Sequence, residues 1–337
     1  MKKVLLAFIL LTGLLQTSCS SDLISESLPI TNSVDVYVAG QKDNQACYWK
    51  NNQPFLLDSG GIMGPVANKI IVANDDVYVL GIGASANPLG AVPMFWKNGV
   101  LTILKTSLST DAEEVMSITD FEVIGNDVYF VGYTRKTIVD FEDYSLFYWK
   151  NGIQTLVHNY GGYAQNQSRI KIANNNVYVT GTNSDNGNVS GMIDGYYTNS
   201  VFTEVPNSML NGFSANNNEI FAFGTKDGIS YYKNITLNSE TTFPITPANG
   251  ITDMYFDNGN MYFTDGSNNI YKNGILFDEG PISSGGIHDF KVLNDNIYRI
   301  THAGEFGFIS FLTINGVQTM ELPNGDGSFQ SIYVVQN

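Results

Sequence analysis

The chain alternates apolar and polar residues in short runs, most clearly between residues 118 and 157. Residues 118–123 alternate, a turn signal follows at Gly125-Asn126-Asp127, and residues 128–132 alternate again. After a variable loop come residues 146–150, an Asn-Gly turn and residues 153–157. Alternation rich in β-branched and aromatic residues, broken by Asn-Gly or Asn-Asp, is typical of hairpin strands. The stretch predicts four short antiparallel strands, which we label A to D in chain order.

This unit recurs along the whole chain. An aromatic residue of strand B returns at spacings of 36 to 51 residues, at Tyr37, Tyr78, Tyr129, Tyr178, Phe221, Tyr262 and Tyr298. The asparagine of the C–D turn returns with it, at Asn51, Asn98, Asn151, Asn199, Asn234, Asn273 and Asn315. A four-stranded unit with this period is typical of β-propeller blades. The alternative, a β-sandwich with a second domain, fits poorly because sandwiches do not repeat at this period.

The two ends of the repeat array complement each other. The first copy begins at strand B, with residues 34–37, and lacks strand A. The last residues, 329–337, align with strand A of the copy at residues 118–126. Pairing the two ends in one sheet would remove an open edge. We therefore expect an all-β, seven-bladed propeller over residues 33–337, in which Phe329 to Asn337 closes the ring beside Val34 to Gly40.

Loop lengths distinguish the two faces of such a ring. The A–B and C–D turns, such as Asn126-Asp127 and Asn151-Gly152, are short and lie at one end of each blade, which we call the turn face. The B–C and D–A connections share the opposite end, which we call the loop face, and vary in length. The longest are residues 82–93, 105–117, 133–145, 158–168 and 182–194. Because binding residues are often carried by variable loops on a rigid scaffold, we expect a site on the loop face of blades 2 to 4.

Within that sector, five residues are the predicted ligand contacts. Arg135, Asp143 and Tyr144 lie in the loop of blade 3, and Tyr160 and Tyr163 lie in the crossover that follows. Aromatic rings beside carboxylates and amides suit a sugar, whose apolar face stacks while its hydroxyls form hydrogen bonds. The alternative is a solvated loop whose aromatic rings pack down onto the blade.

Carboxylates also recur near the start of strand A, at Asp120, Asp253 and Asp289, with Ser331 at the same position in the closing strand. They could bind a cation or act as an acid–base pair, or they could accept backbone hydrogen bonds within the blade. Repetition with the blade period favours the structural role, because catalysis needs one pair rather than several copies.

Three residues break the repeat and are therefore better catalytic candidates: His288, His302 and Glu305. No spacing joins them into a recognised catalytic motif, so we assign no catalytic residue.

Composition narrows the possible partners and cofactors. With 17 basic and 32 acidic residues, the net charge of −15 disfavours nucleic acid. Two cysteines and three histidines offer few metal ligands, and we predict neither metal nor cofactor. Cys47 lies in an apolar strand pattern, which indicates a buried thiol rather than a nucleophile.

The N-terminal residues have the pattern of a secretion signal. Lys2 and Lys3 precede an apolar run from Val4 to Leu15, which is too short to span a bilayer as a helix. The stretch resembles a bacterial lipoprotein signal, which implies cleavage before Cys19 and lipidation of that cysteine; an ordinary cleavable signal is the alternative. We thus expect a signal peptide over residues 1–18 and a tether over residues 19–32. Because Ser20 stands where an aspartate often signals inner-membrane retention, the resemblance implies the outer membrane.

The repeats themselves resemble a known group. Residues 48–51, 95–99 and 148–152 read Tyr-Trp-Lys-Asn, Phe-Trp-Lys-Asn-Gly and Tyr-Trp-Lys-Asn-Gly. They are similar to the Tyr-Trp-Lys-Asn-Gly propellers found among lipoproteins of Bacteroidota-type bacteria, a likeness that covers residues 33–337 and implies architecture and location. We expect a monomeric cell-envelope binding module for glycan or protein, held to the membrane by its lipid only. The alternative is a propeller-type polysaccharide hydrolase or lyase.

Overall fold

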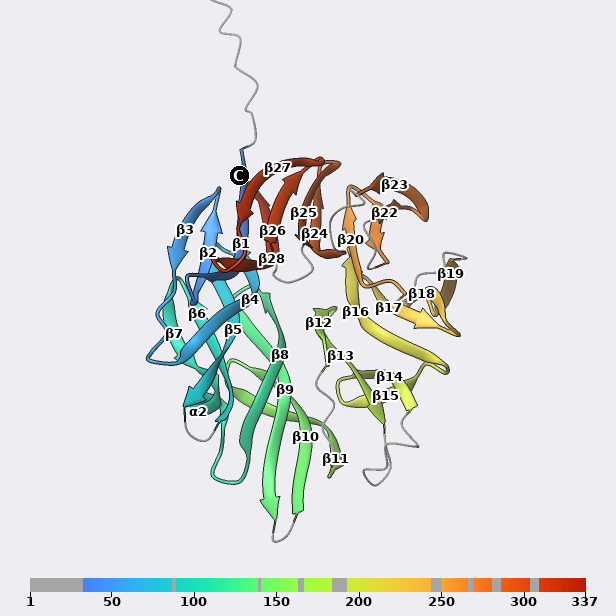
Figure 1. Ribbon diagram of the computed structural model, residues 1–337. Helices are drawn as coiled ribbons and strands as arrows, with labels where there is room; N and C mark the ends of the chain where they lie inside the picture. Colours follow the sequence, from blue (N-terminus) through green and yellow to red (C-terminus); the bar gives the residue numbers. More distant parts are fainter. Residues whose placement is uncertain are drawn as a thin grey trace, which may run out of the picture. The chain divides into compact units, whose positions relative to one another are not determined.

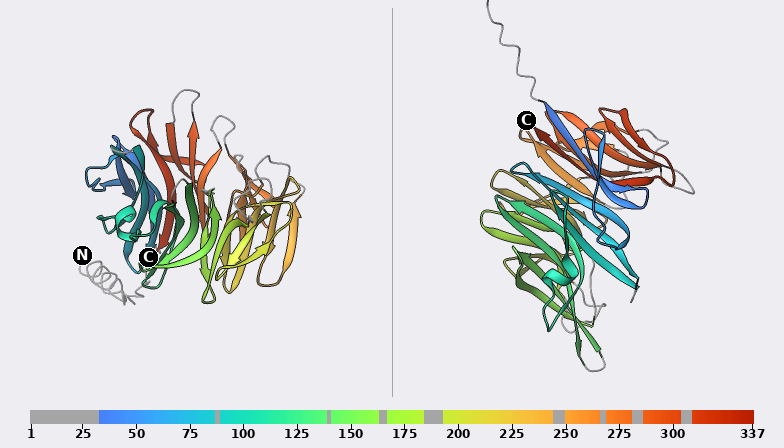
Figure 2. Two further views of the ribbon diagram at one scale, coloured as in Figure 1. Left: turned by 90° about the horizontal axis from the view of Figure 1, so that it is seen from below. Right: turned by 90° about the vertical axis from the view of Figure 1, so that its left-hand side faces the viewer.

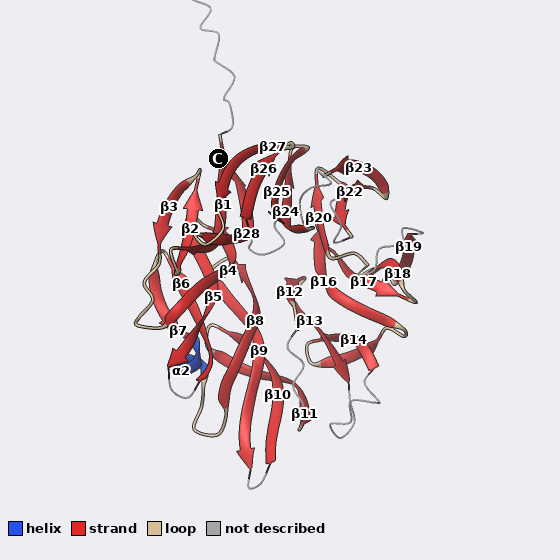
Figure 3. Cartoon of the chain, viewed as in Figure 1, coloured by secondary structure: helices blue, strands red, loops and turns tan. Residues whose placement is uncertain are grey.

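The computed structural model describes the protein over residues 33–86, 89–138, 141–162, 167–183, 193–243, 250–265, 269–280, 286–303 and 309–337. The propeller is all-β, with seven four-stranded antiparallel sheets arranged in a ring (Figure 1). Within the described residues its one helix is α2 (Leu104–Leu108), as Figure 3 shows by colour. Figure 2 shows α2 on the outer side of the propeller, where Leu104 and Leu108 are buried. The predicted seven-bladed propeller is confirmed.

In each blade the strands run in order from the innermost, strand A, to the outermost, strand D. Blade 1 contains β28 (Gly327–Gln336), β1 (Val34–Lys42), β2 (Gln45–Lys50) and β3 (Gln53–Leu56), and blade 2 contains β4 (Met63–Ala73), β5 (Asp76–Ala86), β6 (Leu89–Lys97) and β7 (Val100–Ile103). Blade 3 contains β8 (Glu114–Ile124), β9 (Asp127–Ile138), β10 (Phe141–Lys150) and β11 (Ile153–Gly161). Blade 4 contains β12 (Ile170–Ala173), β13 (Asn176–Asn183), β14 (Ile193–Thr198) and β15 (Val201–Glu204). Blade 5 contains β16 (Ser208–Asn216), β17 (Glu219–Lys226), β18 (Ile229–Asn234) and β19 (Ser239–Phe243). Blade 6 contains β20 (Asp253–Asp257), β21 (Asn260–Thr264), β22 (Asn269–Lys272) and β23 (Ile275–Glu279). Blade 7 contains β24 (Ile287–Leu293), β25 (Asn296–Ala303), β26 (Ile309–Ile314) and β27 (Val317–Leu322).

The C-terminal strand closes the ring, as the complementary ends predict. β28 pairs antiparallel with β1, from Val34 opposite Gln336 to Lys42 opposite Gly327. The register shifts at Gly40, where a Cβ atom would lie 2.0 Å from the Ser328 carbonyl oxygen, so the close approach needs a glycine. Blade 1 therefore takes its inner strand from the end of the chain.

The core lies between the blades. Among the described residues, buried apolar side chains form seven clusters, each joining two neighbouring blades. The cluster between blades 7 and 1 contains Phe329, which packs edge-to-face on Trp49 with 5.0 Å between ring centroids. Trp96 and Trp149, at the same repeat position as Trp49, are also buried. The tryptophans of the repeat are therefore packing residues.

The turn face is held by a set of side-chain contacts that recurs from blade to blade. In blade 3, Asn151 accepts the Val128 N–H at 2.9 Å and donates from Nδ2 to Asp127 at 2.7 Å. Lys150 pairs with the same carboxylate at 2.7 Å, and its Nζ lies 5.4 Å from the centroid of the Tyr129 ring. We call this set the turn clasp. Its asparagine bonds the start of strand B in the same way at Asn51, Asn98, Asn199, Asn273 and Asn315. The recurring Lys-Asn pair is thus explained by structure.

The loop face differs from the sequence expectation. The predicted loop over residues 133–145 is mostly strand, because β9 continues to Ile138 and β10 begins at Phe141. In blade 2, β5 and β6 extend through the predicted loop in the same manner. Residues such as those at 133–138 have the β-branched and aromatic content of a strand, so the hairpins lengthen toward the loop face.

Candidate functional site

The inner strands of all seven blades line a central channel with a cavity volume of about 730 Å³. The strand registers place seven residues in a first ring, each in an inner strand except Arg169, which directly precedes β12: Ser331, Lys69, Asp120, Arg169, Gly212, Asp253 and Asp289. Residues two positions further on form a second ring, toward the turn face: Tyr333, Ile71, Glu122, Lys171, Ser214, Tyr255 and Lys291. Eight of these fourteen residues are charged, four of each sign.

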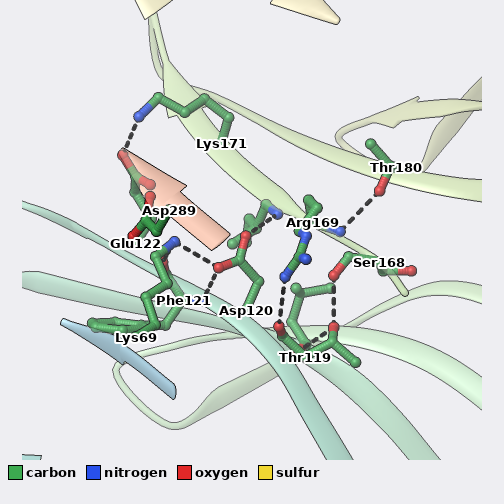
Figure 4. Close-up of polar contacts among 12 residues, drawn as sticks. Lys69, Thr119, Asp120, Phe121, Glu122, Ser168, Arg169, Lys171, Thr180 and Asp289 are labelled. Carbon is green, nitrogen blue, oxygen red and sulfur yellow. Dashed lines mark hydrogen bonds and ion pairs between the residues drawn. The ribbon is translucent and has the colours of Figure 1, made fainter. Parts of the chain in front are cut away.

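Ion pairs join several of these channel charges. The Lys69 Nζ atom lies 2.6 Å from Asp120, and Lys171 lies 2.5 Å from Glu122, so both pairs cross between blades. Lys291 pairs with Asp289 of its own blade at 3.2 Å. Figure 4 shows Lys69 and Arg169 on either side of Asp120. The channel wall is therefore highly charged but largely neutralised.

Asp120 connects blades 3 and 4. It is 4% exposed, and its carboxylate accepts the N–H groups of Phe121 at 2.9 Å and Ile170 of the next blade at 3.0 Å. Burial opposes the charge, but Lys69, Arg169 and these hydrogen bonds hold the pKa of Asp120 below its usual value. Asp289 accepts the Ile332 N–H of the closing strand at 2.8 Å. These carboxylates thus accept backbone hydrogen bonds, as expected, although the donors include the next blade as well as their own.

Asp253 has the electrostatic properties of an acid–base group. Burial and the nearby Asp289 charge raise its pKa to about 7, while Lys291 opposes the shift. Burial and the charges of Asp253 and Asp289 also raise the pKa of Tyr255 well above its usual value, and Tyr255 is hydrogen-bonded to Lys291. A carboxyl group of this kind can take up or release a proton near neutral pH.

The two histidines that break the repeat lie together. His288 and His302 stack with 4.5 Å between ring centroids, and His302 Nε2 lies 2.8 Å from the Phe329 carbonyl oxygen. Burial and the neighbouring His302 lower the pKa of His288. Glu305, the third candidate, lies outside the described residues.

On the loop face, the channel is adjoined by a cavity of about 980 Å³. Its lining comes from blades 2 to 6 and includes Asn68, Ser117, Thr119, Tyr144, Gln167, Arg169, Asn211 and Thr252. Asn68, Thr119, Arg169, Asn211 and Thr252 also line the channel, so the two cavities share a wall. The volume is near the upper end of the roughly 300–1,000 Å³ that is usual for ligand pockets.

Of the predicted contacts, those in blade 3 share one hairpin. Arg135 is bridged by Glu142 at 2.8 Å and Glu114 at 2.7 Å, and these carboxylates raise its pKa. Tyr144 donates its hydroxyl to Glu142 and lines the loop-face cavity. Asp143 accepts a hydrogen bond from Asn159 at 3.2 Å. Tyr144 is thus the predicted contact that borders the cavity.

The other predicted contacts are placed differently. Tyr160 is 1% exposed and donates its hydroxyl to the Thr182 carbonyl oxygen at 3.0 Å, so it packs between blades 3 and 4. Tyr163 lies outside the described residues, as do Cys19 and the predicted signal and tether segments. Cys47 is buried, as predicted, and burial raises its pKa to about 11, which disfavours the reactive thiolate.

Sequence reasoning missed Arg169. It stands at the ring position of Asp120, Asp253 and Asp289, and its guanidinium donates to the Thr119 carbonyl oxygen at 3.3 Å. Among the described residues, it belongs to none of the ion pairs. The available signal was a basic residue at a repeat position that is acidic in other blades.

The described part of the chain contains neither a metal-binding cluster nor a membrane-spanning helix. No group of three or more His, Cys, Asp or Glu side chains there is arranged to hold a metal ion. None of the helices in those ranges is long and apolar enough to cross a membrane.

Comparison with known proteins identifies the fold alone. No family model matches the chain, and no curated protein matches it. Among solved structures, it is similar to the β-propeller domain of the Trilobed protease from Pyrococcus furiosus, with a TM-score of 0.53, 12% identity and coverage of 87% of this chain and 93% of that one. That domain has an open Velcro topology, whereas β28 pairs with β1 here.

Two further solved structures are similar at the same low identity. The computationally designed Ika8 protein aligns with a TM-score of 0.50 and 12% identity, over 88% of this chain and 86% of that one. The acylaminoacyl peptidase of Pyrococcus horikoshii aligns with a TM-score of 0.51 and 12% identity, over 86% of this chain. The match spans half the length of that peptidase.

Proposed function

We propose that this protein is a binding module of the bacterial cell envelope that takes glycan or protein through its loop face. The observation that carries the proposal is the loop-face cavity of about 980 Å³, which side chains from five blades line together. Its lining combines hydroxyl and amide groups with the ring of Tyr144, which is the chemistry that a sugar or a polar peptide needs. A concave site of this kind, framed by rigid strands, is suited to recognition.

The opposite face supports the same assignment. On the turn face, the asparagine of the turn clasp recurs in six of the seven blades, and its polar atoms bond the start of strand B within the same blade. Contacts that repeat in this way stabilise blades and do not distinguish one sector from another. The loop face is where neighbouring blades differ, so selectivity is assigned to it.

A lipid on Cys19 would anchor this module to the outer membrane. The chain enters the propeller at Val34, which is the turn-face end of blade 1. A tether over residues 19–32 would therefore join the propeller at that end of blade 1. Cys19→Ala should release the protein into the soluble fraction and abolish labelling with palmitate. Unchanged palmitate labelling of that variant would contradict the anchor.

The binding face is tested by first screening the propeller domain on a glycan array and by pull-down from envelope extracts. Tyr144→Ala should then weaken binding of the recovered ligand by roughly 1 to 3 kcal/mol with little effect on stability, as expected for an anchor at a surface site. The control is Lys272→Ala on the turn face, where Lys272 pairs with Asp295 at 2.8 Å. Loss of affinity in the control but not in Tyr144→Ala would reverse the assignment of the faces.

A second candidate function is the cleavage of polysaccharide, by a hydrolase or a lyase reaction, and one observation favours it. Asp253 lines the channel with a pKa of about 7 beside Asp289, and such a group could serve as a general acid or base. Release of new reducing ends from any arrayed polysaccharide, abolished by Asp253→Asn, would establish this activity. Turnover that survives Asp253→Asn would exclude this residue as the acid–base group.

A further inference from the structure

Arg169 lines the loop-face cavity, and its backbone is fixed by hydrogen bonds. Its N–H donates to Thr180 Oγ1 at 2.8 Å, and its carbonyl oxygen accepts the Thr180 N–H at 3.0 Å. The preceding Ser168 is buried and hydrogen-bonds to the Tyr133 hydroxyl at 2.7 Å. The base of the side chain is thus held by strand contacts, which lowers the entropy lost when its end binds a ligand.

The charge of Arg169 is not neutralised by an ion pair among the described residues. Asp120 is the nearby carboxylate, but its oxygens already accept from Lys69 Nζ at 2.6 Å and from the N–H groups of Phe121 and Ile170. Lys69 balances the charge of Asp120, which leaves one positive charge in excess in this group of three. By contrast, Arg135 on the same face is bridged by two glutamates.

The surroundings of the guanidinium are polar and come from several blades. Asn68 and Gln167 are exposed at the cavity wall, with Thr119 and Thr252 beside them, and the Tyr144 ring borders the same space. Amides and hydroxyls suit the many hydroxyl groups of a sugar, and a guanidinium fits a carboxylate through two parallel hydrogen bonds. The combination matches an acidic sugar better than a neutral one.

We propose that the loop-face cavity binds a carboxylate-bearing sugar, such as a single uronic or sialic acid unit of a glycan, and that Arg169 binds the carboxylate. This inference rests on the proposed function and specifies the class of ligand. The carboxylate of an acidic sugar would form an ion pair with the Arg169 guanidinium, which belongs to no ion pair among the described residues. The binding should weaken with added salt because the cavity is open to solvent.

The test compares acidic glycans with neutral partners of the same size. The full chain without its first 18 residues is applied to an array of uronate- and sialate-containing glycans, each beside its methyl ester. The best acid and its ester are then titrated by calorimetry against the unchanged protein and Arg169→Gln. We expect the acid to bind more tightly than its ester, and Arg169→Gln to lose roughly 10- to 100-fold in affinity for the acid alone.

The matched control is Lys97→Gln, which removes the same charge on the turn face, where Lys97 pairs with Asp76 at 2.8 Å. It should leave both affinities unchanged, and melting curves of both variants report whether they fold. Equal binding of acid and ester, equal losses in the two variants, or no retention of any acidic glycan overturns this inference. A neutral glycan or a protein that binds through Tyr144 would still support the proposed function, whereas a ligand lost only in Lys272→Ala would overturn both.

Discussion

Closure of the ring by β28 allows a quantitative prediction for Phe329. This side chain is 0% exposed and packs on Trp49 in the cluster that joins blades 7 and 1. Replacing a buried phenylalanine by alanine costs about 3–5 kcal/mol, because transfer energy is lost and a cavity remains. For a domain of about 300 residues, an entropy of unfolding of about 2.1 cal/mol/K per residue gives about 1.6 °C per kcal/mol, and so a fall in melting temperature of roughly 5–8 °C.

The measurement is urea and thermal unfolding of Phe329→Ala, with Phe277→Ala as the control. Phe277 is 42% exposed on the outermost strand β23, so its loss should cost less than about 1 kcal/mol. Deleting residues 328–337 should have a larger effect and leave an insoluble or strongly destabilised protein, which a peptide of those residues should partly rescue. A truncated protein that melts like the full chain would refute closure by this strand.

Two further predictions concern single polar groups. In the folded state the pKa of Asp253 is raised to about 7. Between about pH 4 and 7 the folded protein therefore binds more protons at this group than the unfolded chain does. The contribution of protonated Asp253 to stability is lost as the pH rises through that window. The difference in melting temperature between Asp253→Asn and the unchanged protein should therefore favour the variant more at pH 8 than at pH 4.5. An equal difference at both pH values would contradict the raised pKa of Asp253. Asn151→Ala should lower the free energy of unfolding by about 1–3 kcal/mol, since it breaks the turn clasp and places alanine at φ 50°. Urea titration measures this difference, and a loss in the free energy of unfolding below a few tenths of a kcal/mol would show that the turn clasp is dispensable.

The number of blades and their closure were predictable because their signals are local and repeated. The strand-B aromatic and the turn asparagine mark each blade, and the missing first strand reappears at residues 329–337. The reason for the asparagine needed the structure, which shows Asn151 reaching Asp127 across the blade. The signal was present in the recurring Asp-Val-Tyr of the first three blades, at Asp35, Asp76 and Asp127.

The details of the candidate site depend on registers that alternation alone does not give. The pairing of β10 with β11 shifts between Leu146 and Phe147 and again between Tyr144 and Ser145. Tyr160 lies at the second shift and is buried in the core rather than exposed to solvent. The repeat placed Asp120, Asp253 and Asp289 at one position, but Arg169 was missed because it stands just before the short strand β12, which begins at Ile170. The excess charge of Arg169 follows only from knowing which groups Asp120 already binds.

Hydrogen–deuterium exchange with and without the ligand recovered in the screen tests the central claim, that this propeller binds through its loop face. We predict slowed exchange at the loop-face ends of the blades, in residues 114–120, 142–146 and 167–170, which border the cavity or the hairpin of Tyr144. The turn-face segments 97–100, 150–153 and 272–275 should exchange at unchanged rates. Protection confined to those turn-face segments would contradict the claim.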